Sequence, residues 1–184
     1  MNKLLSTTAL AVLISATAGF AATMPFDVHA NSHVWNNGSG FGSNLGLATG
    51  LSFGLGDTFS VSVDNPLDTW NFCSPSTSCT VDADGRRPAS GTFLGTYSNG
   101  GYSNYYGALV GRIGAGAFFA IGTAGFSGPA NAVGELVLFH WDHNTNNSGS
   151  LAVTVEYETV PLPASLPLML LGLGAVGYAG RRRS

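Results

Sequence analysis

The sequence has little charge and few of the residues that usually carry catalysis. Asp, Glu, Lys and Arg make up 9% of the 184 residues, and there are only two cysteines and four histidines. The chain contains no G-x-S-x-G, no H-E-x-x-H and no Gly-rich phosphate loop. These absences argue against the hydrolases, metalloproteases and nucleotide-binding enzymes that carry such motifs, and we expect a protein that is not an enzyme.

Positive charge is scarce between the two ends of the chain. Lys3 and residues 181–183 supply four of the seven basic residues. The segment 22–158 holds three arginines and all ten acidic residues, a net charge of about −7. So acidic a segment is unsuited to nucleic acid, and we expect no nucleic-acid partner. It suits either solubility or the binding of a divalent cation.

The N-terminal end has the three-part layout of a secretory signal. Met1-Asn2-Lys3 is short and basic, Leu4 to Phe20 is mostly apolar, and small residues precede a cleavage point after Ala21. We therefore predict a signal helix within residues 1–21 that directs export. The alternative is an N-terminal helix buried in the folded protein.

The C-terminal end combines prolines, an apolar run and three arginines. Residues 164–180 are apolar apart from Ser165 and are long enough for a short transmembrane helix. The arginines 181–183 would stay on the cytoplasmic side of that membrane. The prolines keep the preceding segment extended and accessible, since proline cannot continue a helix. The alternative to a processed tail is a permanent tail anchor.

The tail 159–184 resembles the VPLPA variant of the PEP-CTERM sorting signal. The motif residues are Val160, Pro161, Leu162, Pro163 and Ala164. The resemblance implies an inner-membrane exosortase, together with the secretion machinery, as partners. It also implies a protein held in the inner membrane until it is cut near the prolines and passed to the cell envelope, surface or extracellular matrix, often beside exopolysaccharide or biofilm production.

Short alternating segments predict an all-β fold for residues 22–158. Residues 58–63 and 151–157 alternate apolar and polar side chains, which is typical of strands with one buried face. Residues 135–141 are apolar on both faces, so we expect a central strand there. Further strands are expected at 108–113 and 117–121, and edge strands and loops at 31–56. Many short strands joined by Gly, Asn, Ser and Pro favour a β-sandwich of the jelly-roll or galactose-binding-like kind.

The two cysteines are close in sequence. Cys73 and Cys79 flank a Ser/Pro/Thr turn, and in an oxidising compartment we expect them to form a disulfide that closes one loop. A zinc site is not expected, because further soft ligands are missing nearby. The segment 82–85 reads Asp-Ala-Asp-Gly, which lacks the distal Glu of a calcium loop and is predicted to be a turn.

The loop 141–150 is the most informative segment for binding. Asp142, Asn144 and Asn146 occupy alternate positions and Asn147 follows directly. Carboxylate and amide oxygens so closely spaced can surround calcium, which takes six to eight oxygen ligands. A polar hairpin loop without a metal is the alternative, because these residue types also favour turns. His140 and His143 are expected on opposite faces, which does not favour zinc.

A tyrosine-rich segment precedes the predicted strand at 108–113. Its members Tyr102, Tyr105 and Tyr106 lie among Gly, Ser and Asn. Aromatic faces pack on the C–H faces of sugars and the hydroxyls add hydrogen bonds, so these residues are candidates for carbohydrate binding. The alternative is that they cap an edge of the sandwich.

Four segments together resemble the bacterial galactophilic lectins of the PA-I type and their galactose-binding-like relatives. The segments are GALVGRIG (107–114), FAIG (119–122), GELVL (134–138) and NNSGSLAV (146–153), in the same order as in that family. The resemblance implies a β-sandwich and a calcium ion that bridges two sugar hydroxyls. It implies Asp142, Asn146 and Asn147 as calcium ligands, with Asn144 or Thr145 standing in for the family's threonine.

These patterns lead to two functional hypotheses. The first is an exported protein that binds cell-surface or extracellular polysaccharide through calcium. The second is a structural protein of the exopolysaccharide or biofilm matrix, or an adhesion protein, without a small-ligand site.

Overall fold

The structure is a computed structural model that describes residues 20–35, 46–143 and 146–159. Residues 21–158 form one compact unit. Within the described residues the elements, in chain order, are β1 (Phe20–His29), β2 (Leu47–Phe53), β3 (Thr58–Val63), β4 (Trp70–Asn71), the 3₁₀ turn η1 (Thr77–Cys79), β5 (Thr80–Val81), β6 (Thr96–Asn99), β7 (Tyr102–Tyr105), β8 (Leu109–Ile113), β9 (Phe119–Ala120), β10 (Phe126–Pro129), β11 (Gly134–His140) and β12 (Ser150–Thr159).

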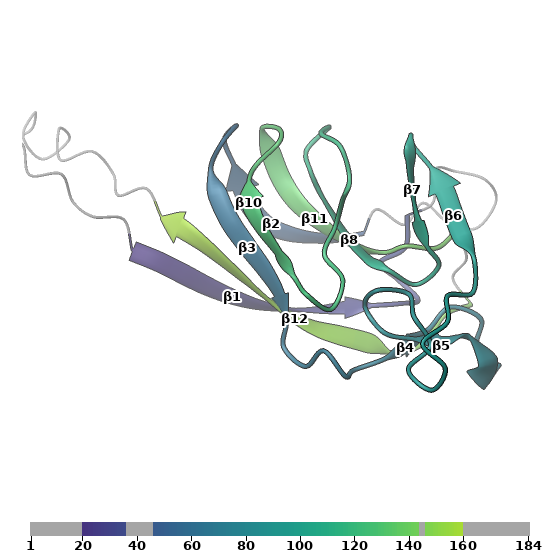
Figure 1. Ribbon diagram of the computed structural model, residues 1–184. Coiled ribbons are helices and arrows are strands. Elements are labelled where there is room, and N and C mark those ends of the chain that lie inside the picture. The colour runs from purple at the N-terminus through teal and green to yellow at the C-terminus, as the bar shows by residue number, and fades with distance from the viewer. Residues whose placement is uncertain (1–19, 36–45, 144–145, 160–184) are drawn as a thin grey trace, which may run out of the picture. The chain divides into compact units, whose positions relative to one another are not determined.

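The longer strands form two four-stranded sheets. The first sheet has the order β1-β12-β3-β10 and the second has the order β2-β11-β8-β9. Two short hairpins, β4–β5 and β6–β7, lie outside them (Figure 1). The all-β class and the sandwich predicted from the sequence are confirmed.

The predicted strands occur close to their expected positions. β3 spans the predicted 58–63, and its partner β12 aligns Val153 with Val63 and Val155 with Val61. β11 lies between β2 and β8, so the segment that is apolar on both faces is indeed a central strand. β2 forms an edge of the second sheet, as expected for the segment 31–56.

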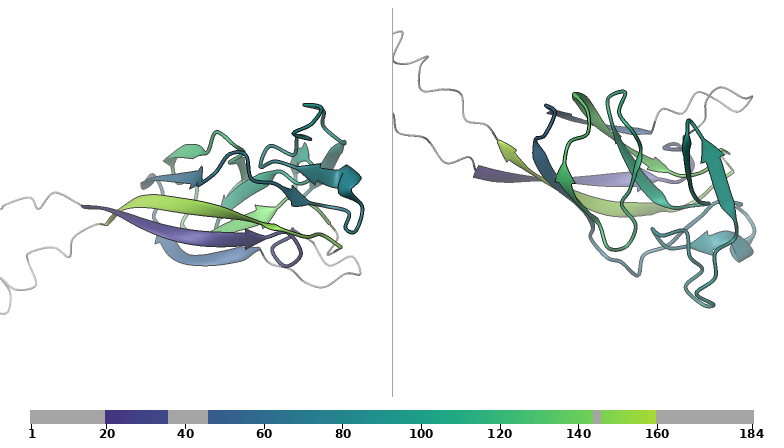
Figure 2. Two further views of the ribbon diagram at one scale, coloured as in Figure 1. Left: turned by 90° about the horizontal axis from the view of Figure 1, so that it is seen from below. Right: turned by 45° about the horizontal axis from the view of Figure 1, so that its top comes forward.

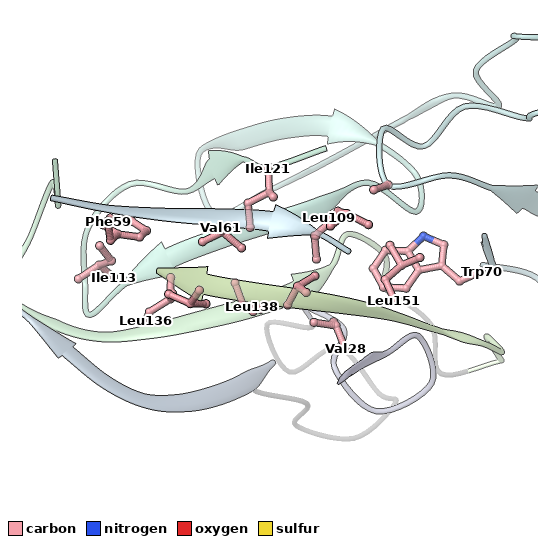
Figure 3. Packing of buried hydrophobic residues seen from close by; sticks show 14 of the residues in the cluster. Val28, Phe59, Val61, Trp70, Leu109, Ile113, Ile121, Leu136, Leu138 and Leu151 are labelled. Carbon is pink, nitrogen blue, oxygen red and sulfur yellow. The ribbon is translucent and has the colours of Figure 1, made fainter. Parts of the chain in front are cut away.

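The main core lies between the two sheets. Alternate residues of β8 and β11 point toward the first sheet and are fully buried; we call this side of the second sheet its inner face (Leu109, Ile113, Leu136, Leu138). Valines of β3 and β12 meet them from the other side, and Figure 3 shows side chains from both sheets meeting in one cluster. Burial of this aliphatic surface is the main stabilising term of the fold.

The other side of the second sheet, its outer face, is also covered. It carries Val110, Arg112, Val137 and Phe139, which occupy the alternate positions of β8 and β11. An aromatic layer packs on it, and we call these residues the outer aromatic cluster (Trp35, Tyr97, Tyr102, Phe118, Phe139, Trp141). Two of its tyrosines come from the β6–β7 hairpin, so this hairpin forms part of the cover.

β1 and β12 run side by side in opposite directions (Figures 1 and 2). Near the start of β12, the Ala30 N–H donates to the Gly149 carbonyl over 2.9 Å. β12 begins directly after the loop 141–149 and ends at residue 159, a length of ten residues. At about 3.3 Å per residue, the loop and the far end of β12 are about 30 Å apart.

Some predictions fall on residues that the structure does not describe. The predicted signal helix lies almost wholly within residues 1–19, and the predicted span 164–180 lies within residues 160–184. Among the described residues, no helix is long and apolar enough to span a membrane. β1 begins at Phe20, one residue before the predicted cleavage point.

Candidate functional site

The loop 141–149 brings a carboxylate and an amide into the interior. Asp142 is 1% exposed and Asn147 is 6% exposed. Asn147 donates from Nδ2 to the Ala30 carbonyl over 3.1 Å, which orients its amide group. Asp142 accepts at Oδ1 from the His143 backbone N–H over 2.6 Å. Asn146 is exposed, and the predicted ligands Asn144 and Thr145 lie outside the described residues.

His140 is a residue of this site whose role could not be read from the sequence. Its imidazole is fully buried; Nδ1 lies 3.4 Å from Asn147 Nδ2, and the ring meets Trp70 edge to face with centroids 4.3 Å apart. Burial lowers the pKa of His140 to about 3, so the ring is neutral at physiological pH. A neutral Nδ1 can accept from Asn147, which makes His140 a positioning residue for that amide.

The two histidines lie in different surroundings. His140 is buried beside Asn147, whereas the half-exposed His143 places Nδ1 3.2 Å from Asp142 Oδ1. In the described part of the chain, no group of three or more His, Cys, Asp or Glu side chains is arranged to hold a metal. Within the described residues this absence applies to zinc and calcium alike, because carboxylates are among these side chains.

The oxygen donors of the loop include an amide as well as a carboxylate. Calcium accepts carboxylate, amide and backbone oxygens. Asp142 and Asn147 supply the first two types within one loop, and Asn147 uses its nitrogen, not its oxygen, to bind Ala30. The described residues therefore fit a hard cation in donor type, with one carboxylate among them.

The tyrosines of the segment 97–106 take different places. Tyr106 stacks on Tyr97 and Phe72, with centroids 5.7 and 5.5 Å apart. Burial, with the charge of Asp142 and the neighbouring Tyr97 as smaller contributions, raises the pKa of the Tyr106 phenol. The Tyr106 ring lies 6.1 Å, between centroids, from the ring of His143, whose Nδ1 is 3.2 Å from Asp142 Oδ1.

Tyr102 and Tyr105 lie elsewhere. Tyr102 packs edge to face on Trp141 at 5.1 Å, and its hydroxyl accepts from Asn104 Nδ2 over 3.1 Å. Burial raises the pKa of this phenol. Tyr105 stacks on Phe93 with centroids 3.7 Å apart. Of the three tyrosines predicted from the sequence, Tyr106 is the one whose ring contacts His143, the neighbour of Asp142.

Trp141 anchors the loop to the outer aromatic cluster. Its indole N–H donates to the Tyr97 carbonyl over 2.8 Å, and its own backbone N–H donates to the Ala108 carbonyl. Trp141 is fully buried. Asp142 therefore follows directly after a residue that is fixed by packing and by two hydrogen bonds.

A second fixed loop, closed by a disulfide, adjoins the candidate loop. Cys73 and Cys79 form the predicted disulfide. The adjoining strands β4 and β5 pair, and Asn71 exchanges two backbone hydrogen bonds with Ser148 in the candidate loop.

The segment 82–85 forms the predicted turn. The Gly85 N–H donates to the Asp82 carbonyl, and Asp82 Oδ1 accepts from the backbone N–H groups of Asp84 and Arg86.

Comparison with known proteins gives one family match and a structural similarity. Residues 159–183 match the PEP-CTERM protein-sorting motif, which confirms the sorting signal predicted from the sequence. No curated protein sequence matches the chain.

The fold is similar to the structure titled "EclA N-terminal domain; PllA-like lectin". The TM-score is 0.50 at 21% sequence identity, over 73% of this chain and 95% of the other. The predicted resemblance to a lectin is thus confirmed at the level of the fold. The chain therefore carries a PEP-CTERM sorting motif, which marks it as an exported protein, and ahead of that motif a domain with the fold of a PllA-like lectin.

Proposed function

We propose that the exported domain binds carbohydrate at the cell surface or in the extracellular matrix, through a calcium ion held by the loop 141–149. The observation that carries this proposal is the placement of Asp142 and Asn147. Both are buried polar residues of the same loop, and both contribute oxygen atoms of the type that calcium prefers.

Asp142 and Asn147 would hold the ion, with Asn146 and the undescribed Asn144 and Thr145 as the remaining predicted ligands. One carboxylate does not fill the six to eight positions of calcium, so backbone carbonyls and ligand hydroxyls complete them. A bound calcium ion would attract vicinal sugar hydroxyls as oxygen ligands. His140 and Ala30 orient the Asn147 amide before any ion arrives, which reduces the ordering that binding requires.

The aromatic surroundings supply the second half of a sugar site. Tyr106 lies beside His143, the neighbour of Asp142, and is only partly buried, so its exposed part is available to a pyranose beside the ion. Tyr102 instead packs edge to face against Trp141, the first residue of the loop. We therefore assign sugar contact to Tyr106 and a supporting role to Tyr102.

The candidate loop lies far from the point where the sorting motif begins. The sorting motif begins at residue 159, where β12 ends, and the candidate loop lies at the other end of the same strand. Processing by an exosortase near the proline motif would leave the domain attached or released at the end of β12. The loop would stay accessible to extracellular polysaccharide in either case.

A glycan-binding measurement tests this function. The purified full chain, in a detergent without a sugar headgroup, is screened against a panel of neutral and acidic glycans in calcium and again in EDTA. We expect at least one glycan to bind only in calcium, and Asp142→Ala to abolish that binding. Asp27→Ala, which removes an exposed carboxylate on β1, is the matched control and should bind normally.

The structural-matrix hypothesis predicts that no glycan binds in a calcium-dependent way. The absence of any calcium-dependent glycan, combined with self-association of the chain in EDTA, would contradict the proposed function and favour a matrix or adhesion role.

A further inference from the structure

A pocket lies beside Tyr105, and none of its lining residues belongs to the loop 141–149. Tyr105 stacks on Phe93, whereas its neighbour Tyr106 stacks on Tyr97 and Phe72 near Asp142. The two adjacent tyrosines therefore serve different surroundings. The pocket combines one guanidinium, one carboxylate, one amide and two aromatic rings (Asp84, Arg86, Phe93, Asn104, Tyr105).

Arg86 is the cationic group of this pocket and its backbone is fixed. Its N–H donates to Asp82 Oδ1 over 2.9 Å, and its carbonyl accepts from the Asp82 N–H over 2.8 Å. The guanidinium lies 5.5 Å from the centre of the Phe93 ring. This cation–π contact holds the side chain near the aromatic pair and leaves its N–H donors available to a ligand.

Arg86 forms no ion pair with a carboxylate of the described residues, although Asp84 lines the same pocket. Within the described residues, the ion pair that the structure shows joins His143 to Asp142, and none involves an arginine. Arg112, on the outer face, is held against Phe118 and Trp35 and donates from Nε to the Gly116 carbonyl.

Arg86 and Arg87 are the remaining arginines of the acidic segment 22–158, and they are adjacent. The pocket therefore carries one cationic side chain on a negatively charged domain, with the carboxylates of Asp82 and Asp84 close by. A guanidinium in such a place can pair with the anionic group of a ligand.

Asp84 is a fixed acceptor in the same pocket. Its Oδ1 accepts from the Thr123 N–H over 2.9 Å, and its Oδ2 accepts from the Thr123 hydroxyl over 2.6 Å. Gly122 permits this close approach, because a Cβ at that position would lie 2.2 Å from Asp84 Oδ1. Each carboxylate oxygen keeps a further acceptor site for a ligand hydroxyl.

We propose that this pocket binds a uronic acid residue of an acidic polysaccharide. A uronate carries a carboxylate at one end of its ring, which suits Arg86, and hydroxyls at the other end, which suit Asp84 and Asn104. The exposed part of Phe93 (37%) offers an apolar contact to the C–H groups of the ring, and Tyr105 stacks on Phe93 and holds it in place.

The combination selects against other ligands. A neutral sugar leaves Arg86 without an anionic partner, and an acidic peptide has no vicinal hydroxyls for Asp84. This inference rests on the proposed function only in taking the ligand to be a carbohydrate, and it requires no calcium.

The test is a calorimetric titration of the full chain in EDTA, in a detergent without a sugar headgroup. The probes are an oligoglucuronate, a neutral gluco-oligosaccharide of equal length, and oligoglutamate of equal charge. We expect the oligoglucuronate to bind at least tenfold more tightly than either of the others. Weak binding of all three, or equal binding of oligoglutamate, would overturn the assignment.

Two matched pairs of variants locate the binding. Arg86→Gln should weaken oligoglucuronate binding at least tenfold, whereas Arg87→Gln, with the same change in net charge, should weaken it less than threefold. Phe93→Ala should weaken it at least threefold, whereas Leu94→Ala, at a residue of nearly equal exposure (38% against 37%), should not. Equal losses within either pair would overturn the pocket as the site.

The two proposed sites can be tested independently of each other. Asp142→Ala should leave the EDTA-resistant binding of oligoglucuronate unchanged, while it removes calcium-dependent binding. If the calcium-dependent binding is absent in the unmodified chain and the uronate still binds, the proposed calcium site is wrong and the uronate pocket stands. If oligoglucuronate binding requires calcium or Asp142, the uronate pocket is wrong.

Discussion

The two faces of the second sheet are both buried, but they are built from different residues. The inner face presents aliphatic side chains of β8 and β11 to the valines of the first sheet. The outer face presents Val110 and Arg112 to the outer aromatic cluster, whose members come from β11 itself (Phe139), from loops and from the β6–β7 hairpin. The inner face packs against the first sheet and so forms the core of the sandwich. The outer face is covered by an additional aromatic layer, which a two-sheet sandwich does not require.

This difference matters for the candidate site, because the loop 141–149 begins at Trp141, which belongs to the outer aromatic cluster. Asp142 comes directly after Trp141. Tyr97, which accepts from the Trp141 indole, also stacks on Tyr106. The outer layer therefore positions the candidate site, and we expect changes on the two faces to differ in kind.

The largest expected effect is on the inner face. Leu138→Ala removes a fully buried side chain and should lower the free energy of unfolding by about 2–5 kcal/mol. Val137→Ala, one residue away on the outer face and only partly buried, should cost less than half as much. Urea unfolding followed by circular dichroism measures both. Equal losses would contradict the division of roles between the faces.

The inner face of β11 ends in a buried polar side chain, His140, which should make the fold sensitive to acid. The folded pKa is about 3 and the ordinary value is 6.5. The unfolded chain therefore takes up a proton below pH 6.5 that the folded chain does not. As the pH falls below 6.5, the free energy of unfolding should decrease by about 1.4 kcal/mol per pH unit, which amounts to about 2 kcal/mol at pH 5.

Variants at two histidines check this assignment. His140→Phe should remove most of the loss of stability between pH 7 and pH 5, as measured by urea unfolding at each pH. His29→Gln, at an exposed histidine, should keep it. An unchanged pH profile in His140→Phe would show that other groups cause the acid sensitivity.

A smaller effect is expected from the cation of the outer face. Arg112→Met removes the contacts with Phe118 and Trp35 and the hydrogen bond to the Gly116 carbonyl. The free energy of unfolding should fall by about 1 kcal/mol, because the side chain is partly exposed and its apolar stem is retained. Thermal unfolding measures it. A loss as large as that of Leu138→Ala would remove the distinction between the faces.

Much of the sandwich could be predicted from the sequence, since its signals are local. Period-two alternation located β3 and most of β12, and the continuous apolar run located the central β11. β1 was missed, because Pro25 and the adjoining apolar leader hide its alternation. The β6–β7 hairpin was also missed, because its role depends on which face of the sheet it covers, and that is a tertiary property.

The candidate site was predictable in part for the same reason. The closely spaced Asp and Asn residues identified the loop 141–149, and the disulfide followed from cysteine spacing. The role of His140 depends on contacts with Asn147 and Trp70, which lie 7 and 70 residues away in the sequence. The pocket at Arg86 and Asp84 likewise forms only when the segments 84–93, 104–109 and 120–122 meet.

The most direct test of the account is a calorimetric titration of the purified full chain with calcium alone. The account predicts one calcium ion per chain, bound by the unmodified chain and by Asp27→Ala but not by Asp142→Ala. Equal calcium binding by Asp142→Ala, or no binding by the unmodified chain, would contradict the claim that the outer layer positions a calcium-dependent site.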